Sequence, residues 1–280
     1  MNTTNTTNRF WLPVWTLAVR EVVRFLRQKT RLIGAFGQPV IFWVLFGSGF
    51  QSTFRPPAWA PADLTYQEYF FPGVALLIVM FTAIFSTISI IEDRNAGFLQ
   101  GVLVAPVSRA AIVFGKLTGG TILAVFQAAL FLAIGPLLSV VNLSPAIKLQ
   151  LAVGDYFLLL GFLIVISFSL TALGFAIAWP LDSTQGFHAI MSVLLMPLWL
   201  LSGAIFPATG EGWLSWMIRL NPLSYELAGL RRIMNPELSG VPSSDLPGMV
   251  WCVLVTVGFC SMMVAVDLFL MTRSRIKNVR

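Results

Sequence analysis

Side chains able to act as nucleophiles, general bases or metal ligands are few and scattered in this chain. It contains one histidine, His188, and two cysteines, Cys252 and Cys260, with no His-Glu-x-x-His motif or cysteine cluster. Catalytic and metal centres need several such groups at fixed spacing. The two cysteines lie eight residues apart in one apolar run, which on a helix separates them by about 12 Å, too far for a disulfide. The sequence therefore predicts no catalytic residue and no metal site.

The segment most like a nucleotide-binding loop is Ala110–Leu117, which contains Gly115 and Lys116. A phosphate-binding loop needs glycine at its first position and Ser or Thr directly after the lysine. Here Ala110 and Leu117 stand at those positions, and the segment runs straight into an apolar stretch. We therefore expect no ATP and no other cofactor on this chain.

The composition of the chain indicates which kind of structure carries these residues. The chain has 280 residues, of which 57% are hydrophobic and 11% are charged, whereas soluble domains have about 45–50% and about 25%. Uncharged apolar runs of about 20 residues are typical of membrane-spanning helices. We identify six, at Leu32–Phe50, Phe70–Ile91, Leu117–Val141, Tyr156–Trp179, Phe187–Phe206 and Met249–Met271. The prediction is an all-α polytopic membrane protein with one six-span domain, 32–271, an N-terminal segment, 1–31, and a basic tail, 272–280.

The net charge of +6 would suggest nucleic acid in a soluble protein, but in a membrane protein it sets orientation. With six spans and both termini in the cytoplasm, 13 of the 18 basic residues lie inside: Arg9, Arg20, Arg24, Arg27, Lys29, Arg31, Arg94, Arg109, Lys116, Arg273, Arg275, Lys277 and Arg280. This bias predicts cytoplasmic termini and contacts with membrane lipids, and not with nucleic acid.

The segment before the first span predicts an amphipathic helix that ends near Lys29. Its basic stripe consists of Arg20, Arg24, Arg27 and Arg31. The opposite stripe is apolar and includes Trp11 and Trp15. Such a helix places its cations at anionic headgroups and its rings at the acyl boundary. Two roles stay open, a general membrane anchor and a helix that steers the first span.

The loop after the second span carries the most informative pattern. Glu92 and Arg94 close the span, Gly97 allows a tight turn, a short apolar helix is predicted at 98–103, and Pro106 ends it. The apolar stripe of that helix, Phe98, Leu99, Val102 and Leu103, needs a partner to cover it. The partner is either another protein or the lipid surface.

This pattern resembles the permease subunits of type-2 ATP-binding-cassette exporters, in particular the bacterial daunorubicin-resistance and nodulation-type branch. The resemblance rests on the Glu92/Arg94 pair, Gly97, the helix, Pro106–Arg109 and Gly115-Lys116, and it continues through 196–207 and 221–225. It implies that the helix is a coupling helix that docks on a separate ATPase. The implied docking residues are Glu92, Arg94, Gly97, Phe98, Leu99, Gln100, Val102, Leu103, Pro106 and Arg109, with a second contact at Asp182, Ser183 and Gln185.

The same resemblance implies the partners and the location of the protein. Two copies of a cognate ABC ATPase would carry ATP and Mg²⁺, and a second permease copy would complete the path. The location implied is the bacterial cytoplasmic (inner) membrane.

The segment Pro207–Pro247 is long for a loop and contains two helix-like, apolar stretches, Trp213–Arg219 and Pro222–Met234. We expect two re-entrant helices on the outer side, because such backbone is tolerated at membrane depth where protein covers it. Glu226 with Arg231 or Arg232 is expected to form an ion pair there, either within the protein or on its surface.

Aromatic and proline residues within the spans are candidates for lining a path for an amphipathic substrate, although lipid-facing residues have the same composition. The candidates are Trp43, Phe46, Phe81, Phe85, Pro197 and Trp199.

The resulting hypothesis is a permease subunit of an ATP-driven exporter of hydrophobic or amphipathic, drug-like compounds. Export of polysaccharide or glycolipid by the same family is one alternative, and a non-transporting assembly or regulatory subunit is another. An ion-coupled carrier would depend on Asp155 or Asp267, two acidic residues that each lie within about a turn of a span end.

Overall fold

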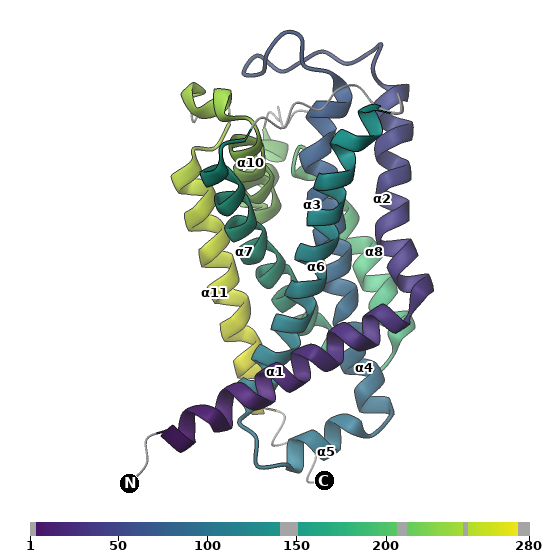
Figure 1. Cartoon of the computed structure of the whole chain (residues 1–280), viewed down its shortest axis with the longest axis vertical. Coiled ribbons are helices and arrows are strands. Elements are labelled where there is room, and N and C mark those ends of the chain that lie inside the picture. Colours follow the sequence, from purple (N-terminus) through teal and green to yellow (C-terminus); the bar gives the residue numbers. More distant parts are fainter. Residues whose placement is uncertain (1–3, 141–150, 206–211, 243–245, 274–280) are drawn as a thin grey trace.

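The computed structural model describes residues 4–140, 151–205, 212–242 and 246–273, and within these ranges every regular element is a helix (Figure 1). The elements are α1 (Thr4–Arg27), α2 (Lys29–Gly49), α3 (Tyr66–Ser86), α4 (Ile88–Asn95), α5 (Phe98–Val104), α6 (Arg109–Val140), α7 (Val153–Ala178), α8 (Thr184–Leu201), α9 (Trp213–Leu220), α10 (Pro222–Met234), the short 3₁₀ helix η1 (Pro236–Gly240) and α11 (Met249–Arg273).

Five helical stretches are long and apolar enough to cross a membrane: Tyr66–Asn95, Arg109–Leu137, Val153–Ala178, Thr184–Leu201 and Met249–Arg273. The first predicted span falls in α2, where the apolar stretch Phe36–Gly49 is shorter. The protein is therefore an all-helical polytopic membrane protein with about five to six candidate spans. The predicted span ends at Val141 and Phe206, and the tail beyond Arg273, lie outside the described residues.

Helix α6 begins at Arg109, before the third predicted span, which begins at Leu117. Lys116 thus lies inside the helix, with a side chain only 4% exposed. Its Nζ is close to two carboxylates, and their charge allows the lysine to be buried.

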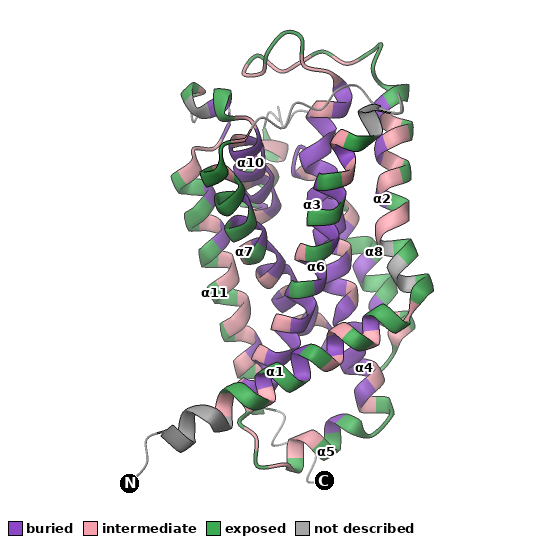
Figure 2. Cartoon of the chain, in the orientation of Figure 1, coloured by how far each residue is buried: buried purple, intermediate pink, exposed green. Residues whose placement is uncertain are grey.

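Helix α3 is the centre of the bundle. It is buried along nearly its whole length, whereas α11 exposes most of its surface (Figure 2). It packs against α2, α6 and α7, and Thr87 separates it from α4. The helix begins with a capping box, in which Thr65 accepts from the Glu68 backbone and the Glu68 side chain accepts from Thr65.

Helix α1 lies across the end of the bundle that carries α4 and α5, against the first half of α6 (Figure 1). Two glycines of α6 allow this close approach. A Cβ atom on Gly115 would lie 2.8 Å from the Cβ of Leu17, and one on Gly119 would lie 2.7 Å from the Cβ of Glu21. As predicted, the amphipathic helix ends just before Lys29, at Arg27.

The two helices expected between the fifth and last spans are present as α9 and α10. Helix α10 packs between α7 and α11, where Gly229 brings it against the Phe162 ring. Helix α9 has no buried residue, and Trp213 and Trp216 are both exposed.

Candidate functional site: an ionic cluster above a short helix

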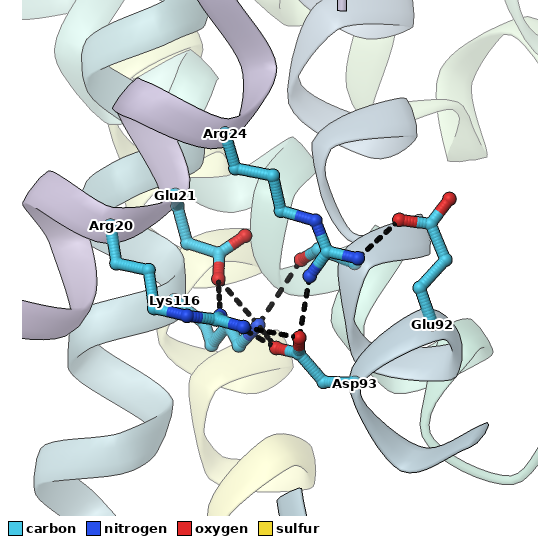
Figure 3. Close-up of polar contacts among 7 residues, drawn as sticks. Arg20, Glu21, Arg24, Glu92, Asp93 and Lys116 are labelled. Carbon is cyan, nitrogen blue, oxygen red and sulfur yellow. Dashed lines mark hydrogen bonds and ion pairs between the residues drawn. The ribbon is translucent and has the colours of Figure 1, made fainter. Parts of the chain in front are cut away.

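Six charged side chains from three helices form one connected cluster (Figure 3), and one of them, Arg20, contacts Phe98 of α5. We call it the ionic cluster; its members are Arg20, Glu21 and Arg24 of α1, Glu92 and Asp93 of α4, and Lys116 of α6. Three cations meet three carboxylates, so the cluster is neutral as a whole. It fixes the relative positions of α1, α4 and α6.

Asp93 is the centre of the ionic cluster. Its two oxygens accept from Arg20 at 2.7 and 2.9 Å, from Arg24 at 2.5 Å and from the Lys116 Nζ at 2.5 Å. The side chain is only 1% exposed. A carboxylate without these partners would be costly at this depth, so the three cations are a condition for burying Asp93.

The remaining carboxylates extend the ionic cluster to both sides. Glu21 accepts from the Lys116 Nζ at 2.6 Å and from Arg20 at 3.1 Å, and Glu92 accepts from Arg24 at 2.6 Å. Hydrogen bonding to Asp93 raises the pKa of the Arg20 guanidinium above its ordinary value. Arg20 therefore stays charged at any physiological pH.

Part of the basic stripe of the amphipathic helix pairs with this chain. Arg20 and Arg24 form ion pairs with the carboxylates of α4, which lie beside α1 in the fold. Trp11 and Trp15, predicted to lie at the acyl boundary, are about 60% exposed. From Phe10 to Arg27, the side chains that α1 buries are Val14, Leu17, Ala18, Glu21 and Phe25. Arg27 is exposed, and the side chain of Arg31 lies outside the described residues.

Helix α5 begins and ends close to the predicted positions. Gly97 has a φ of 74°, the left-handed conformation that glycine favours, and the helix ends two residues before Pro106. The Arg20 guanidinium lies 3.7 Å above the Phe98 ring, which joins α5 to the ionic cluster.

The apolar side of α5 is less open than predicted. Leu99 is buried against this chain, and Val102 and Leu103 are partly buried. Phe98 remains 38% exposed and Val104 86% exposed, beside the exposed Gln100. Sequence reasoning did not select Val104, although it is the most accessible apolar side chain of the helix.

The loop between α7 and α8 lies next to the end of α4. Arg94 donates to the carbonyls of Trp179 and Leu181, the latter at 2.9 Å, and forms an ion pair with Asp182 at 3.0 Å. Asp182 is 84% exposed, Ser183 caps α8 through the Gly186 amide, and Gln185 is exposed. The two segments expected to contact a partner are thus linked by one arginine.

Comparison with known proteins identifies the family of this chain. Residues 13–235 match the ABC-2 type transporter family. This chain belongs to that family. The match confirms the resemblance drawn from the loop around Gly97.

Three relatives of this ABC-2 permease carry informative names. It is 29% identical over 220 residues to the putative transport permease ycf38 of Cyanophora paradoxa, a match that covers 78% of this chain and 72% of the relative. It is 27% identical over 169 residues to the probable multidrug ABC transporter permease YbhR of Escherichia coli K12, covering 60% and 44%. It is 24% identical over 217 residues to the daunorubicin resistance ABC transporter permease protein DrrB1 of Streptomyces coeruleorubidus, covering 77% and 72%.

Family membership makes this permease a non-catalytic transporter subunit, and ABC-2 permeases pair with ATPase subunits. In the part of the chain that the structure describes, no three His, Cys, Asp or Glu side chains are grouped as a metal site would need. His188 is exposed, and its ring lies 5.3 Å from that of Phe85.

Two of the aromatic residues proposed to line a path are enclosed within the permease. Trp43 and Trp199 are at most 2% exposed and donate to the carbonyls of Gln67 and Gly73. Phe46, Phe81 and Phe85 are partly buried, and Pro197 is exposed. Trp43 and Trp199 therefore brace α3, because an indole N–H in a dry interior needs an acceptor.

Arg109 contacts the end of the last helix. Its guanidinium donates to the Met271 carbonyl at 2.6 Å, which joins the start of α6 to the end of α11.

The ion pairs expected for Glu226 are absent among the described residues. Glu226 accepts from Ser169 at 3.1 Å, whereas Arg231 and Arg232 donate to backbone carbonyls. Residues five or six apart on a helix point in different directions, so neither arginine reaches the carboxylate.

Sequence reasoning missed three members of the ionic cluster: Glu21, Asp93 and Lys116. The available signals were one acid within a basic stripe and a lysine next to an apolar run, since a cation at a span needs a counter-ion.

Proposed function

We propose that this permease forms the translocation path of an ATP-driven exporter in a bacterial cytoplasmic membrane. Six spans cross the membrane, namely α2, α3 with α4, α6, α7, α8 and α11, and both termini lie in the cytoplasm. Family membership supports the class of protein, and the excess of Lys and Arg at one end supports the orientation.

The ATPase docks on α5 together with the loop Asp182–Gln185. Both segments lie at the same end of the bundle, and Arg94 connects them. Val104 and Phe98 supply exposed apolar surface, and Asp182 supplies an exposed charge. An apolar centre with charged surroundings is the usual anatomy of a protein interface.

The observation that carries this proposal is the ionic cluster above α5. A displacement of α4 and α5 must either move α1 and α6 with it or separate Asp93 from its three cations. Separating a buried ion pair costs about 3–5 kcal/mol, so the concerted movement is favoured. The ionic cluster therefore transmits the closure of the ATPase to the spans.

The cargo is a hydrophobic or amphipathic compound. The names of two relatives, a probable multidrug permease and a daunorubicin resistance permease, support a drug-like compound over the alternative of polysaccharide or glycolipid. Two ATPases and a second copy of this chain complete the exporter.

Docking can be tested with Val104→Asp, which places a charge in the exposed apolar surface of α5. Permease and cognate ABC ATPase are expressed together, and the amount of ATPase that co-purifies is measured. We expect a loss of about tenfold or more, because a desolvated charge at an interface centre is strongly unfavourable.

The matched control is Val153→Asp, the same substitution at a 74% exposed valine that begins α7. Equal co-purification of both variants would overturn docking on α5. If no ABC ATPase purifies with the wild type, the non-transporting alternative replaces the exporter. Transport that persists with an ATPase unable to hydrolyse ATP, and stops when the proton gradient collapses, would identify an ion-coupled carrier.

A further inference from the structure

A cavity of about 320 Å³ lies at the end of the bundle opposite α5. Its walls come from the connection between α2 and α3, the first turns of α3, the end of α10 and η1. Cavities of about 300–1,000 Å³ with apolar walls and a few polar groups are typical of small-molecule sites.

Arg231 of α10 lies in the wall of this cavity and is only 5% exposed. Its Nη2 donates to the Gly203 carbonyl at 2.8 Å, and its guanidinium lies 4.1 Å from the Tyr69 ring and 5.7 Å from the Trp59 ring. The Nε has no hydrogen-bond partner, and no carboxylate of the described residues forms an ion pair with Arg231. This leaves a buried cation without a counter-ion, held by the Gly203 carbonyl, by the ring and hydroxyl of Tyr69 and by the ring of Trp59.

The next residue shows what a purely structural arginine looks like here. Arg232 donates to four backbone carbonyls, at Pro247, Leu238, Val241 and Leu246. Its donors thus fasten η1 and the following loop to α10. Arg231 lies beside a cavity and has no ion-pair partner among the described residues, although buried charges are normally paired.

We propose that this cavity binds the anionic head of an acidic amphiphile, with a carboxylate or phosphate group on Arg231 and its apolar body against the rings of Trp59 and Phe71. The proposal rests on the exporter function and names the chemical class of its cargo at the outer end of the path. Arginine is suited to this task because its planar fork matches carboxylate and phosphate oxygens.

Three acids in the cavity wall shape the selectivity of the site. The Oε2 of Glu68 accepts from the backbone N–H and the hydroxyl of Thr65, which holds this carboxylate at the start of α3. Asp63 and Glu237 are exposed at the rim. Their negative charge repels small anions that arrive from water. An anion whose apolar body also contacts the cavity can bind in spite of this repulsion.

Binding can be tested on the full-length permease in phosphatidylcholine nanodiscs, without the ATPase. The probe is radiolabelled 2-naphthoate, with neutral 2-naphthylmethanol for comparison and empty nanodiscs for lipid partitioning. We expect saturable naphthoate binding that weakens about tenfold or more in Arg231→Gln and less in Arg231→Lys, because the ion pair requires the cation. Binding of the alcohol stays the same in all three proteins.

Arg55→Gln is the matched control, since it removes the same charge from an exposed arginine outside the cavity. The proposal is overturned if naphthoate binds no tighter than the alcohol, or if Arg231→Gln and Arg55→Gln behave alike. The double variant Asp63→Asn/Glu237→Gln tests the site without touching Arg231, which also holds Gly203. It should bind naphthoate about two to five times more tightly, since exposed charges contribute modestly, and unchanged binding would count against the site.

An anionic lipid is a second source of the same chemistry. Phosphatidylglycerol is therefore added to nanodiscs that contain the wild type. If this lipid displaces naphthoate, the natural occupant is a lipid; if it does not, the occupant is a free amphiphile. Both results support an anion site. Because no ATPase is present, a negative result leaves docking on α5 intact, and failed docking leaves this binding measurement valid.

Discussion

The two ends of the helical bundle treat buried charge in opposite ways. Beside α5, Asp93 is surrounded by three cations, and each carboxylate of the ionic cluster has a partner. Near the other end, Glu226 and Arg231 lie five residues apart on α10, both buried, and do not pair with each other. A closed network of ion pairs holds helices together, whereas Arg231 has no ion pair and lies beside a cavity. In the two proposals above, one end of the bundle transmits movement and the other accepts a molecule.

The largest effect should follow from Asp93→Asn, which keeps the shape of the side chain and removes its charge. Arg20, Arg24 and Lys116 then share two carboxylates, and a buried cation loses its partner. We expect the free energy of unfolding to fall by about 3–5 kcal/mol. Thermal unfolding of the purified permease in nanodiscs measures this.

A second substitution shows whether charge balance is the cause. Adding Lys116→Met to Asp93→Asn removes the cation with the lowest exposure in the ionic cluster and restores neutrality. The free energy of unfolding should fall less in the double variant than the two single losses added together, by about 0.5–3 kcal/mol. Strict additivity would show that the two side chains act independently.

A smaller effect is expected from Gly119→Ala, which tests how closely α1 and α6 must pack beside the ionic cluster. The added Cβ would lie 2.7 Å from the Cβ of Glu21 and 3.1 Å from the Ala18 carbonyl, so α1 must move away from α6. Overpacking of this kind costs about 1–3 kcal/mol.

The control for this substitution is Gly161→Ala in α7, where nothing lies within 4 Å of the new atom. There alanine should be neutral or stabilising by up to about 1 kcal/mol, because it favours the helix. If both variants unfold at the same temperature, close contact between α1 and α6 is not needed.

The features that could be predicted from sequence are those with a local signal. Hydropathy indicated the spans, and Gly97 and Pro106 bounded α5 because a positive φ and a missing N–H act on their immediate neighbours. The ionic cluster could not be predicted in this way. Lys116 meets a carboxylate 95 residues away and Asp93 meets an arginine 73 residues away, and only tertiary packing brings them together.

The same limit applies at the start of α6. Taken alone, Lys116 is a charge that ends a span, and the arginines of α1 are a stripe that faces headgroups. Once α1 lies across α6, these charges neutralise one another. Charge predicts topology reliably only where its partner is water or lipid.

The smallest effect should come from Glu226→Gln, which is the counterpart of Asp93→Asn on α10. The side chain is fully buried, Ser169 donates to Oε1, and Oε2 has no partner. Replacing the carboxyl with an amide breaks no ion pair, and Ser169 can still donate to the remaining oxygen. The free energy of unfolding should therefore change by less than about 1 kcal/mol. A loss as large as that for Asp93→Asn would mean that Glu226 has a charged partner, and the two ends of the bundle would then handle buried charge alike.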